Sequence, residues 1–375
     1  MSLLAEINQR ALQLGVPLSV QLDVTYRCNE RCVHCYLDHD DHGELPREEI
    51  VAILDQLADA GTLFLTFSGG EVFLRRDFLA LVAHARRRLF NVKIKTNAAL
   101  IREQEARQIR ELGVDQVQIS VYSHRPEVHD GVTRLPGSLE RTLTAIRRLR
   151  AHGVKVSIAN VLMTRNVADQ VEVQQLARDL GVGYTLDPTI TPRMDGDRSI
   201  LGLRIASADL HRILHDESLV GDVQEFCAPP QNVGADIMEG YPCSAGHTFA
   251  YISPYGEVFP CVQFPLACGN LRRQRFHEIW RASPALQEVR SIRAKDLVVC
   301  SACLHVGTCS RCPGLAYMEG DMRGPSTADC EKSLQRTGIA SAGMLRFGEL
   351  SRPRLVQIQP VTPLSAPQSA LSAAR

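Results

Sequence analysis

Three cysteines lie close together near the start of the chain, in the segment Cys28-Asn-Glu-Arg-Cys32-Val-His-Cys35. They follow an apolar run, residues 19–24, that is typical of a buried strand. A short loop with three thiolates at this spacing fits one corner of an iron–sulfur cluster and leaves the fourth iron without a protein ligand. Such an iron can bind a substrate or cofactor directly, whereas a closed set of four cysteines mainly carries electrons or holds structure.

Two other interpretations of these cysteines remain open. The first is a zinc knuckle, although no fourth ligand lies near and His34 sits between two of the cysteines, where it could hardly complete the same tetrahedron. The second is a group of buried structural thiols, which rarely cluster at this spacing.

The cysteine spacing, its place behind the first strand and the aromatic Tyr36 after it resemble the radical S-adenosylmethionine (SAM) superfamily. A second expected strand, residues 63–67, leads into Gly69-Gly70-Glu71, which is similar to the family's Gly-Gly-Glu motif. The resemblance implies that Gly69, Gly70 and Glu71 bind the methionine amino group of SAM. The chemistry agrees, because glycines allow a close backbone approach to a ligand and a carboxylate pairs with an ammonium group.

The same resemblance implies further contacts to SAM. Tyr36 is expected near the adenine edge, and Ser120, at the end of the fourth expected strand, resembles the serine that contacts SAM. Asn160, at the end of the fifth, is placed to reach the ribose or the adenine. Arg134 resembles the arginine that pairs with the SAM carboxylate, a task that suits the guanidinium fork, but a surface arginine in a loop is an equally open interpretation.

Composition narrows the class of protein. The chain has 375 residues, enough for two domains, and its formal net charge is +0 with a pI near 7.2. There is therefore no global electrostatic case for a nucleic acid or an anionic membrane as partner. No apolar run approaches about 20 residues, and no signal-peptide pattern opens the chain, so we expect a cytoplasmic protein. In that setting 12 cysteines indicate metal binding rather than disulfides.

The body of the chain alternates between strand and helix patterns. Strands are expected at residues 19–24, 63–67, 91–96, 115–121, 154–160 and 183–187, and helices at 46–60, 77–89, 102–112, 138–152, 168–180 and 207–216. This order predicts an α/β fold with a parallel sheet and right-handed crossovers, as a partial (βα)6 barrel. In such folds the chemistry sits at the C-terminal ends of the strands, where the cysteine loop, Gly69-Gly70-Glu71, Ser120, Asn160 and Asp187 all fall.

Nine further cysteines lie between residues 227 and 330. Their spacing, together with a hairpin pattern over residues 251–261, resembles the SPASM extension, which holds two auxiliary iron–sulfur clusters. By that resemblance Cys243, Cys261 and Cys312 hold the first cluster, and Cys300, Cys303, Cys309 and Cys330 hold the second. We expect Cys227 as the fourth ligand of the first cluster, with Cys268 or an open position as alternatives. Read alone, C-x2-C-x5-C-x2-C also fits zinc.

These patterns divide the chain into four expected parts. Residues 1–16 form an N-terminal arm, 17–220 the radical SAM barrel, 221–340 the cysteine-rich SPASM domain, and 341–375 a disordered tail rich in Ser, Ala, Pro and Gln.

The resemblance implies three [4Fe-4S] clusters, SAM, and an electron donor of the flavodoxin or ferredoxin type. It favours an oxidoreductase that takes hydrogen from a ribosomally made peptide or protein and leaves a net-oxidative modification such as a crosslink or dehydrogenation. The first alternative is a radical SAM enzyme that acts on a small molecule such as a tetrapyrrole. The second alternative is a non-catalytic scaffold for electron transfer. With only 27 residues before Cys28, a peptide substrate is expected to need a separate leader-recognition protein. No catalytic acid or base is identified.

Overall fold

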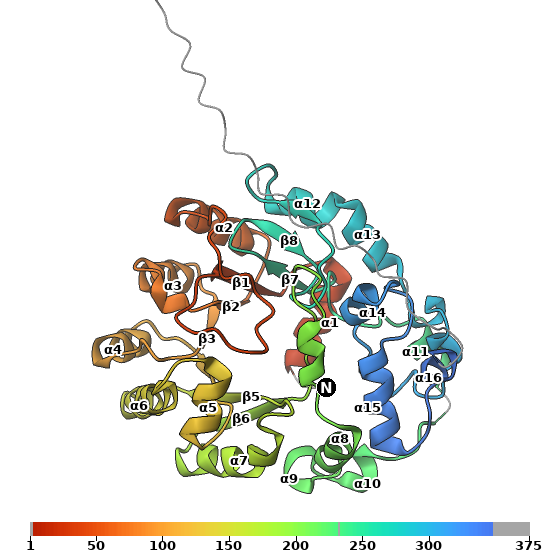
Figure 1. Cartoon of the computed structure of the whole chain (residues 1–375). Helices are drawn as coiled ribbons and strands as arrows, with labels where there is room; N and C mark the ends of the chain where they lie inside the picture. Colours follow the sequence, from red (N-terminus) through yellow and green to blue (C-terminus); the bar gives the residue numbers. More distant parts are fainter. Residues whose placement is uncertain (1–2, 232, 348–375) are drawn as a thin grey trace, which may run out of the picture.

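The computed structural model describes residues 3–231 and 233–347, and its centre is a curved nine-stranded sheet (Figure 1). The strand order is β6-β5-β4-β3-β2-β1-β7-β8-β9. Strands β1 to β6 and β7 pair in parallel, and β8 and β9 continue the sheet in antiparallel pairs. The strands span Ser19–Thr25, Phe64–Gly69, Asn91–Thr96, Gln116–Ser120, Val156–Val161, Gly183–Asp187, Phe249–Ile252, Glu257–Phe259 and Gly269–Asn270.

Helices cover the convex side of the barrel part of this sheet (Figure 1). These are α2 (Arg47–Asp59), α3 (Phe78–Arg87), α4 (Glu103–Glu111), α6 (Ser138–Ala151) and α7 (Gln170–Asp179). The other α-helices are α1 (Leu3–Leu14), α5 (Pro126–Thr133), α8 (Ser207–Leu214), α9 (Glu217–Val220), α10 (Val223–Phe226), α11 (Ala235–Met238), α12 (Phe276–Ala282), α13 (Pro284–Ser291), α14 (Pro313–Met318), α15 (Thr327–Thr337) and α16 (Ala342–Phe347). The fold class predicted from the sequence, a partial (βα)6 barrel with a cysteine-rich region after it, is confirmed.

The barrel strands alternate between apolar and polar side chains. In β3, Val92 and Ile94 are fully buried in the core between sheet and helices. Lys93 and Lys95, between and after them, point to the opposite face, because successive side chains of a strand alternate. Polar residues occupy the same inner face on the neighbouring strands: Gln21, Asp23, Thr66, Ser68, Gln116, Gln118, Thr185 and Asp187. Closed barrels of this type usually fill their interior with branched apolar side chains. The polar interior of this barrel instead suits water or a polar ligand.

The expected hairpin forms, and it extends the barrel sheet. Strand β7 pairs in parallel with β1, with Val20 beside Ala250, and β8 then turns back along β7. The cysteine-rich region is therefore continuous with the barrel sheet through backbone hydrogen bonds.

Several helices were not predicted from the sequence. Helix α5 lies between the expected strand 115–121 and the expected helix 138–152, and Pro126 opens it at its first position, which suits a residue without an amide hydrogen. Helices α9 to α15 lie beyond the last expected helix, residues 207–216. Helix α16 occupies the first residues of the expected tail, whereas residues 348–375 lie outside the described part of the chain. Among the described residues, the helices are too short or too polar to cross a membrane.

Candidate active site

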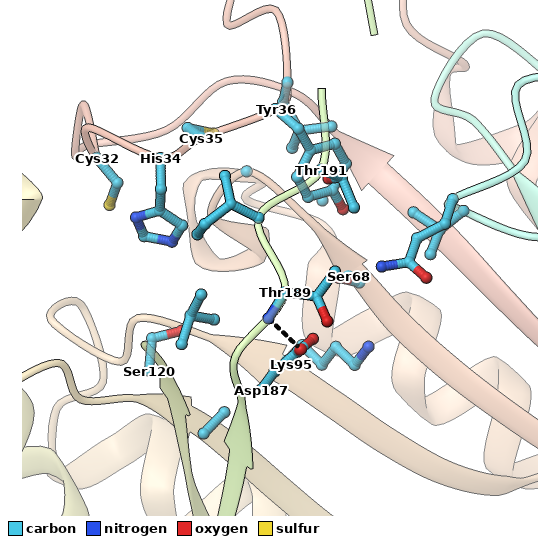
Figure 2. Close-up of a pocket in the computed structure, with 18 of the residues that line it drawn as sticks. Cys32, His34, Cys35, Tyr36, Ser68, Lys95, Ser120, Asp187, Thr189 and Thr191 are labelled. Atoms are coloured by element: carbon cyan, nitrogen blue, oxygen red, sulfur yellow. Dashed lines mark hydrogen bonds between the residues drawn. The ribbon is translucent and has the colours of Figure 1, made fainter. Parts of the chain in front are cut away.

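A cavity of about 440 Å³ opens at the C-terminal ends of the barrel strands. Figure 2 shows the cysteine loop along one side and residues from the strand ends, among them Ser68, Lys95 and Asp187, on the other. Volumes of roughly 300–1,000 Å³ are typical of small-molecule sites. The lining residues used below are Cys28, Cys32, Cys35, Tyr36, Ser68, Gly69, Gly70, Lys95, Asn97, Gln118, Ser120, Asn160, Asp187, Val262 and Gln263.

All three cysteines of the loop line this cavity. Burial raises the pKa of the Cys28 thiol to about 12 and also raises the pKa of Cys32 and Cys35. A bound iron supplies the positive charge that such buried thiolates need. The Glu30 amide donates to the Cys28 sulfur at 3.4 Å, and the Tyr122 hydroxyl points to the Cys32 sulfur at 4.0 Å. The donor set therefore fits an iron–sulfur cluster.

The spacing of potential ligands disfavours a single zinc ion. Tetrahedral thiolates around one zinc lie about 3.8 Å apart. Within residues 3–231 and 233–347, one group of three potential ligand atoms has all its members within 4.8 Å of one another. It consists of Asp38, Asp40 and His42 on the surface. No cysteine belongs to that group.

Gly69 and Gly70 bring the end of β2 against the chain that leads into the cysteine loop. Gly69 has φ of +130°, and a Cβ there would lie 2.1 Å from the Thr25 carbonyl oxygen. A Cβ on Gly70 would lie 2.3 Å from the Arg27 carbonyl oxygen. The Gly70 amide donates to the Thr25 carbonyl at 2.8 Å. Both glycines line the cavity, but the close approach that demands glycine is to backbone rather than to a ligand.

The prediction that the Glu71 carboxylate pairs with an ammonium group is not supported. Glu71 is fully buried and does not line the cavity. Its oxygens accept hydrogen bonds from the Thr96 hydroxyl at 2.8 Å and from the amides of Phe73 at 3.0 Å and Asn97 at 2.9 Å. These three donors hold the carboxylate in place, so it ties the segment after β2 to the end of β3.

Three predicted SAM contacts do line the cavity: Tyr36, Ser120 and Asn160. Asn160 is 1% exposed, and its Nδ2 has no hydrogen-bond partner among the described residues. A buried amide donor without a partner is costly, so it fits an acceptor on a bound cofactor such as a ribose hydroxyl or a ring nitrogen.

Arg134 does not reach the cavity. It ends helix α5 in the left-handed conformation, with φ of +56°, and its side chain is exposed. The assignment of Arg134 to the SAM carboxylate is therefore not supported, and the surface interpretation is favoured.

Comparison with known proteins identifies the family. The model of the radical SAM superfamily matches residues 22–177, and that of an iron–sulfur cluster-binding SPASM domain matches residues 243–313. The mycofactocin maturase MftC of Mycobacterium tuberculosis (strain H37Rv) is 30% identical over 366 residues, which cover 93% of this chain and 90% of that protein. The chain belongs to the radical SAM superfamily.

Two further similarities bear on this radical SAM enzyme. An AdoMet-dependent heme synthase of Methanosarcina barkeri is 29% identical over 333 residues, covering 81% of this chain and 93% of that protein. Among solved structures, SuiB of Streptococcus suis bound to its precursor peptide SuiA superposes with a TM-score of 0.69 at 18% identity, over 87% of this chain and 79% of SuiB. At that identity the structural likeness concerns the fold alone.

The SPASM domain brings the second predicted set of cysteines together. Cys300, Cys303, Cys309 and Cys330 line one small cavity of about 60 Å³. The Ala342 amide, at the start of α16, donates to the Cys303 sulfur at 3.4 Å. Helix α16, which lies in the first residues of the expected tail, therefore contacts this site.

The first predicted set has three members near one another and no fourth cysteine. The thiols of Cys243 and Cys312 both raise the pKa of Cys261, although burial is the larger cause. Cys312 caps helix α14, where its sulfur accepts from the Leu315 amide at 3.5 Å. A helix N-terminus stabilises a thiolate, which suits a metal ligand.

Cys227 is not placed to complete this set, contrary to the prediction. Its thiol donates to the Leu214 carbonyl at 3.4 Å, and its charged neighbour is Arg336. The alternative, Cys268, is buried in the main core and donates to the Leu266 carbonyl. The side chain beside the set is Gln263, whose Oε1 lies 3.8 Å from the Cys312 sulfur.

Several cavity residues were not singled out from the sequence. Lys95, Gln118 and Thr185 point into the barrel interior, and Gln263 enters from the SPASM domain. The polar positions that alternate with Val and Ile in the third and fourth strands were a signal for the first two. No local pattern marks Gln263, because its place depends on pairing of β7 with β1.

Proposed function

We propose that this radical SAM enzyme modifies a ribosomally made peptide or protein by a net-oxidative reaction, such as a crosslink or a dehydrogenation. Its cofactors are SAM, one [4Fe-4S] cluster at Cys28, Cys32 and Cys35, and two auxiliary [4Fe-4S] clusters in the SPASM domain. The chemistry that SAM and a reduced cluster supply together is homolytic cleavage to a 5′-deoxyadenosyl radical, which takes a hydrogen atom from the substrate.

The chain's own residues hold and shield this reaction. Ser120, Asn160 and Tyr36 line the part of the cavity assigned to SAM, and Gly69 and Gly70 fix the cysteine loop against β2. Burial at the carboxyl ends of the strands limits the access of water to a reactive radical.

One observation carries the oxidative assignment. The two residues after Cys261, Val262 and Gln263, line the same cavity as the three cysteines of the SAM loop. The first auxiliary site therefore adjoins the cavity wall. After hydrogen abstraction, a substrate radical must lose one electron and one proton to complete a two-electron oxidation. Cys243, Cys261 and Cys312 would hold a cluster at this site, and such a cluster would supply an acceptor for the electron. A ferredoxin- or flavodoxin-type carrier would then take that electron from the protein.

A peptide substrate is supported by the relatives. The mycofactocin maturase matches nearly the full length of this chain, and its name describes a maturation enzyme. AlbA of Bacillus subtilis, named as a biosynthesis protein of the bacteriocin subtilosin, is 26% identical over 315 residues. We further propose that a separate leader-binding protein presents the precursor. The relatives named as a maturase and a synthase are enzymes, so they do not support the alternative function of a non-catalytic electron-transfer scaffold.

The test is turnover by anaerobically reconstituted enzyme with SAM, dithionite and each small peptide encoded beside its gene. We expect one peptide to lose hydrogen in a SAM-dependent reaction that also yields 5′-deoxyadenosine, with a leader-binding protein added where the genome encodes one. Absence of modification in every peptide, while 5′-deoxyadenosine still forms, would overturn the peptide assignment.

A tetrapyrrole is the second candidate substrate, and the similarity to the heme synthase of Methanosarcina barkeri favours it. The same assay with iron coproporphyrin III, a tetrapyrrole that carries propionate side chains, separates the two. A change in the tetrapyrrole with no change in any peptide would assign the small-molecule function.

A further inference from the structure

Lys95 lies in the cavity without a charged partner. It projects from β3 into the polar barrel interior, where its side chain is exposed to the cavity (Figure 2). Its Nζ donates one hydrogen bond, to Gln21 Oε1 at 3.1 Å. No carboxylate oxygen of the described residues lies within 4.0 Å of Lys95 Nζ, the limit for an ion pair. An ammonium group has three donors, so part of its capacity is left for a ligand.

A series of hydrogen-bonded polar side chains holds Lys95 in place but forms no ion pair with its ammonium group. Gln21 Nε2 donates to Asp23 Oδ1 at 3.0 Å, and the Tyr251 hydroxyl donates to Asp23 Oδ2 at 2.9 Å. The Gln21 amide therefore lies between the ammonium group and the buried carboxylate of Asp23. Burial lowers the pKa of Lys95, and the charges of Asp23, Cys261 and Asp187 oppose that effect. An anion from the cavity would offset the cost of keeping the ammonium charged.

The other charged residues discussed at the cavity wall each have a polar or charged neighbour. Arg193 forms an ion pair with Asp197 at 3.5 Å, although its Nε makes no hydrogen bond among the described residues. Asp187 accepts a hydrogen bond from the Thr189 amide at 2.8 Å, which Figure 2 shows. Glu30 lies in the cysteine loop beside Cys32. Lys95 is therefore the cation at this cavity that lacks an ion pair among the described residues.

We propose that Lys95 binds a carboxylate group of the substrate and so orients the substrate within this cavity. This assignment deepens the proposed function and rests on it, because it concerns the substrate of the same cavity. A carboxylate is shared by the two candidate substrate classes: a peptide offers its C-terminus or an acidic side chain, and a tetrapyrrole offers propionates. A lysine acts here as a compact point charge, which accepts either geometry.

SAM also carries a carboxylate, but Lys95 lies away from the position assigned to it. Asn97, whose Nδ2 lies 3.9 Å from the Cys28 sulfur, marks the end of β3 nearest to the cluster site. Lys95 is two residues earlier, roughly 7 Å deeper along the strand. The group that Lys95 meets is therefore expected to lie deeper in the barrel than a ligand held at the cysteine loop.

The experiment measures dissociation constants of anaerobically reconstituted enzyme for two carboxylate probes in the presence of SAM. One is the peptide identified by the turnover assay, in its free-acid and C-terminal amide forms, with acidic side chains replaced in turn. The other is iron coproporphyrin III. The variant is Lys95→Met, with Lys95→Arg as the conservative change. The matched control is Lys93→Met, which removes a lysine from the same face of β3 but outside the cavity lining.

We expect Lys95→Met to weaken binding of one carboxylate probe at least tenfold, while SAM affinity changes less than threefold and Lys93→Met changes neither. Lys95→Arg should recover most of the lost affinity. Blocking the recognised carboxylate should weaken wild-type binding and leave Lys95→Met unaffected.

Three results would overturn the proposal: full affinity of Lys95→Met for both probes, an equal loss of SAM binding, or a wild-type enzyme that binds neither carboxylate class. Binding of the porphyrin alone, with the same dependence on Lys95, would keep this proposal and reject the peptide function.

Discussion

The Glu71 carboxylate accepts hydrogen bonds from the Thr96 hydroxyl at 2.8 Å through both of its oxygens. Together with the amide donors Phe73 and Asn97, this contact joins the end of β2 to the end of β3 directly below the cysteine loop. The glutamate of the Gly-Gly-Glu segment is therefore part of the scaffold of the site.

Glu71→Gln should destabilise the protein by about 2–3 kcal/mol, because a side-chain amide group would face donors that now meet a buried carboxylate. Thr96→Val, which removes one donor, should cost about 1 kcal/mol. Urea unfolding of both variants measures this. Wild-type stability of Glu71→Gln would contradict the structural role and return the residue to ligand binding.

Gly70→Ala should displace the cysteine loop, since its Cβ would lie 2.3 Å from the Arg27 carbonyl oxygen. We expect the reconstituted variant to lose about four irons per chain, or to misfold. Gly131→Ala is the matched control, because a Cβ there meets nothing within 4 Å inside helix α5. It should keep its full iron content. Normal iron content in Gly70→Ala would show that the loop tolerates the shift.

The auxiliary sites make a separate prediction. A Cys300/Cys303→Ala double variant should lose about four irons while the SAM site keeps its cluster. Cys227→Ala should lose none, because its thiol donates to the Leu214 carbonyl away from the first set. Iron and sulfide analysis distinguishes the two. Loss of iron from Cys227→Ala would restore that cysteine as a ligand.

The pH dependence of stability should report on Asp23. Burial raises the pKa of Asp23 from 3.8 to about 6, so its contribution to stability is complete below about pH 4 and is lost as the pH rises through about 6. The difference corresponds to about 3 kcal/mol. Asp23→Asn removes this titration and should flatten the curve of unfolding free energy between about pH 4 and 7. Parallel curves for wild type and variant would exclude this carboxyl group as the cause.

Local patterns explain what the sequence could predict. Cys28, Cys32 and Cys35 lie within one loop, so their spacing alone indicated a shared ligand. The strands were recognisable because buried residues such as Val92 and Ile94 recur at every second position. The four ligands of the second auxiliary site came from resemblance to the SPASM pattern.

Long-range geometry explains why the structure places some residues away from their expected positions. The left-handed conformation at the end of α5 directs the Arg134 side chain to the surface. The sequence pattern around Arg134 does not reveal where this side chain points. Cys227 was chosen for its order in the chain, whereas the fold directs it to α8. Pairing of β7 with β1 joins residues that are more than 200 positions apart, and it alone brings Gln263 to the cavity.

The most direct test of the central claim is the iron content and SAM cleavage of enzyme purified and reconstituted without oxygen. We predict about twelve irons per chain and formation of 5′-deoxyadenosine with dithionite and SAM. In a Cys28/Cys32/Cys35→Ala variant the count should fall to about eight and the product should disappear. Product formation by that triple variant, or none by an iron-replete wild type, would contradict the assignment of the radical chemistry to this loop.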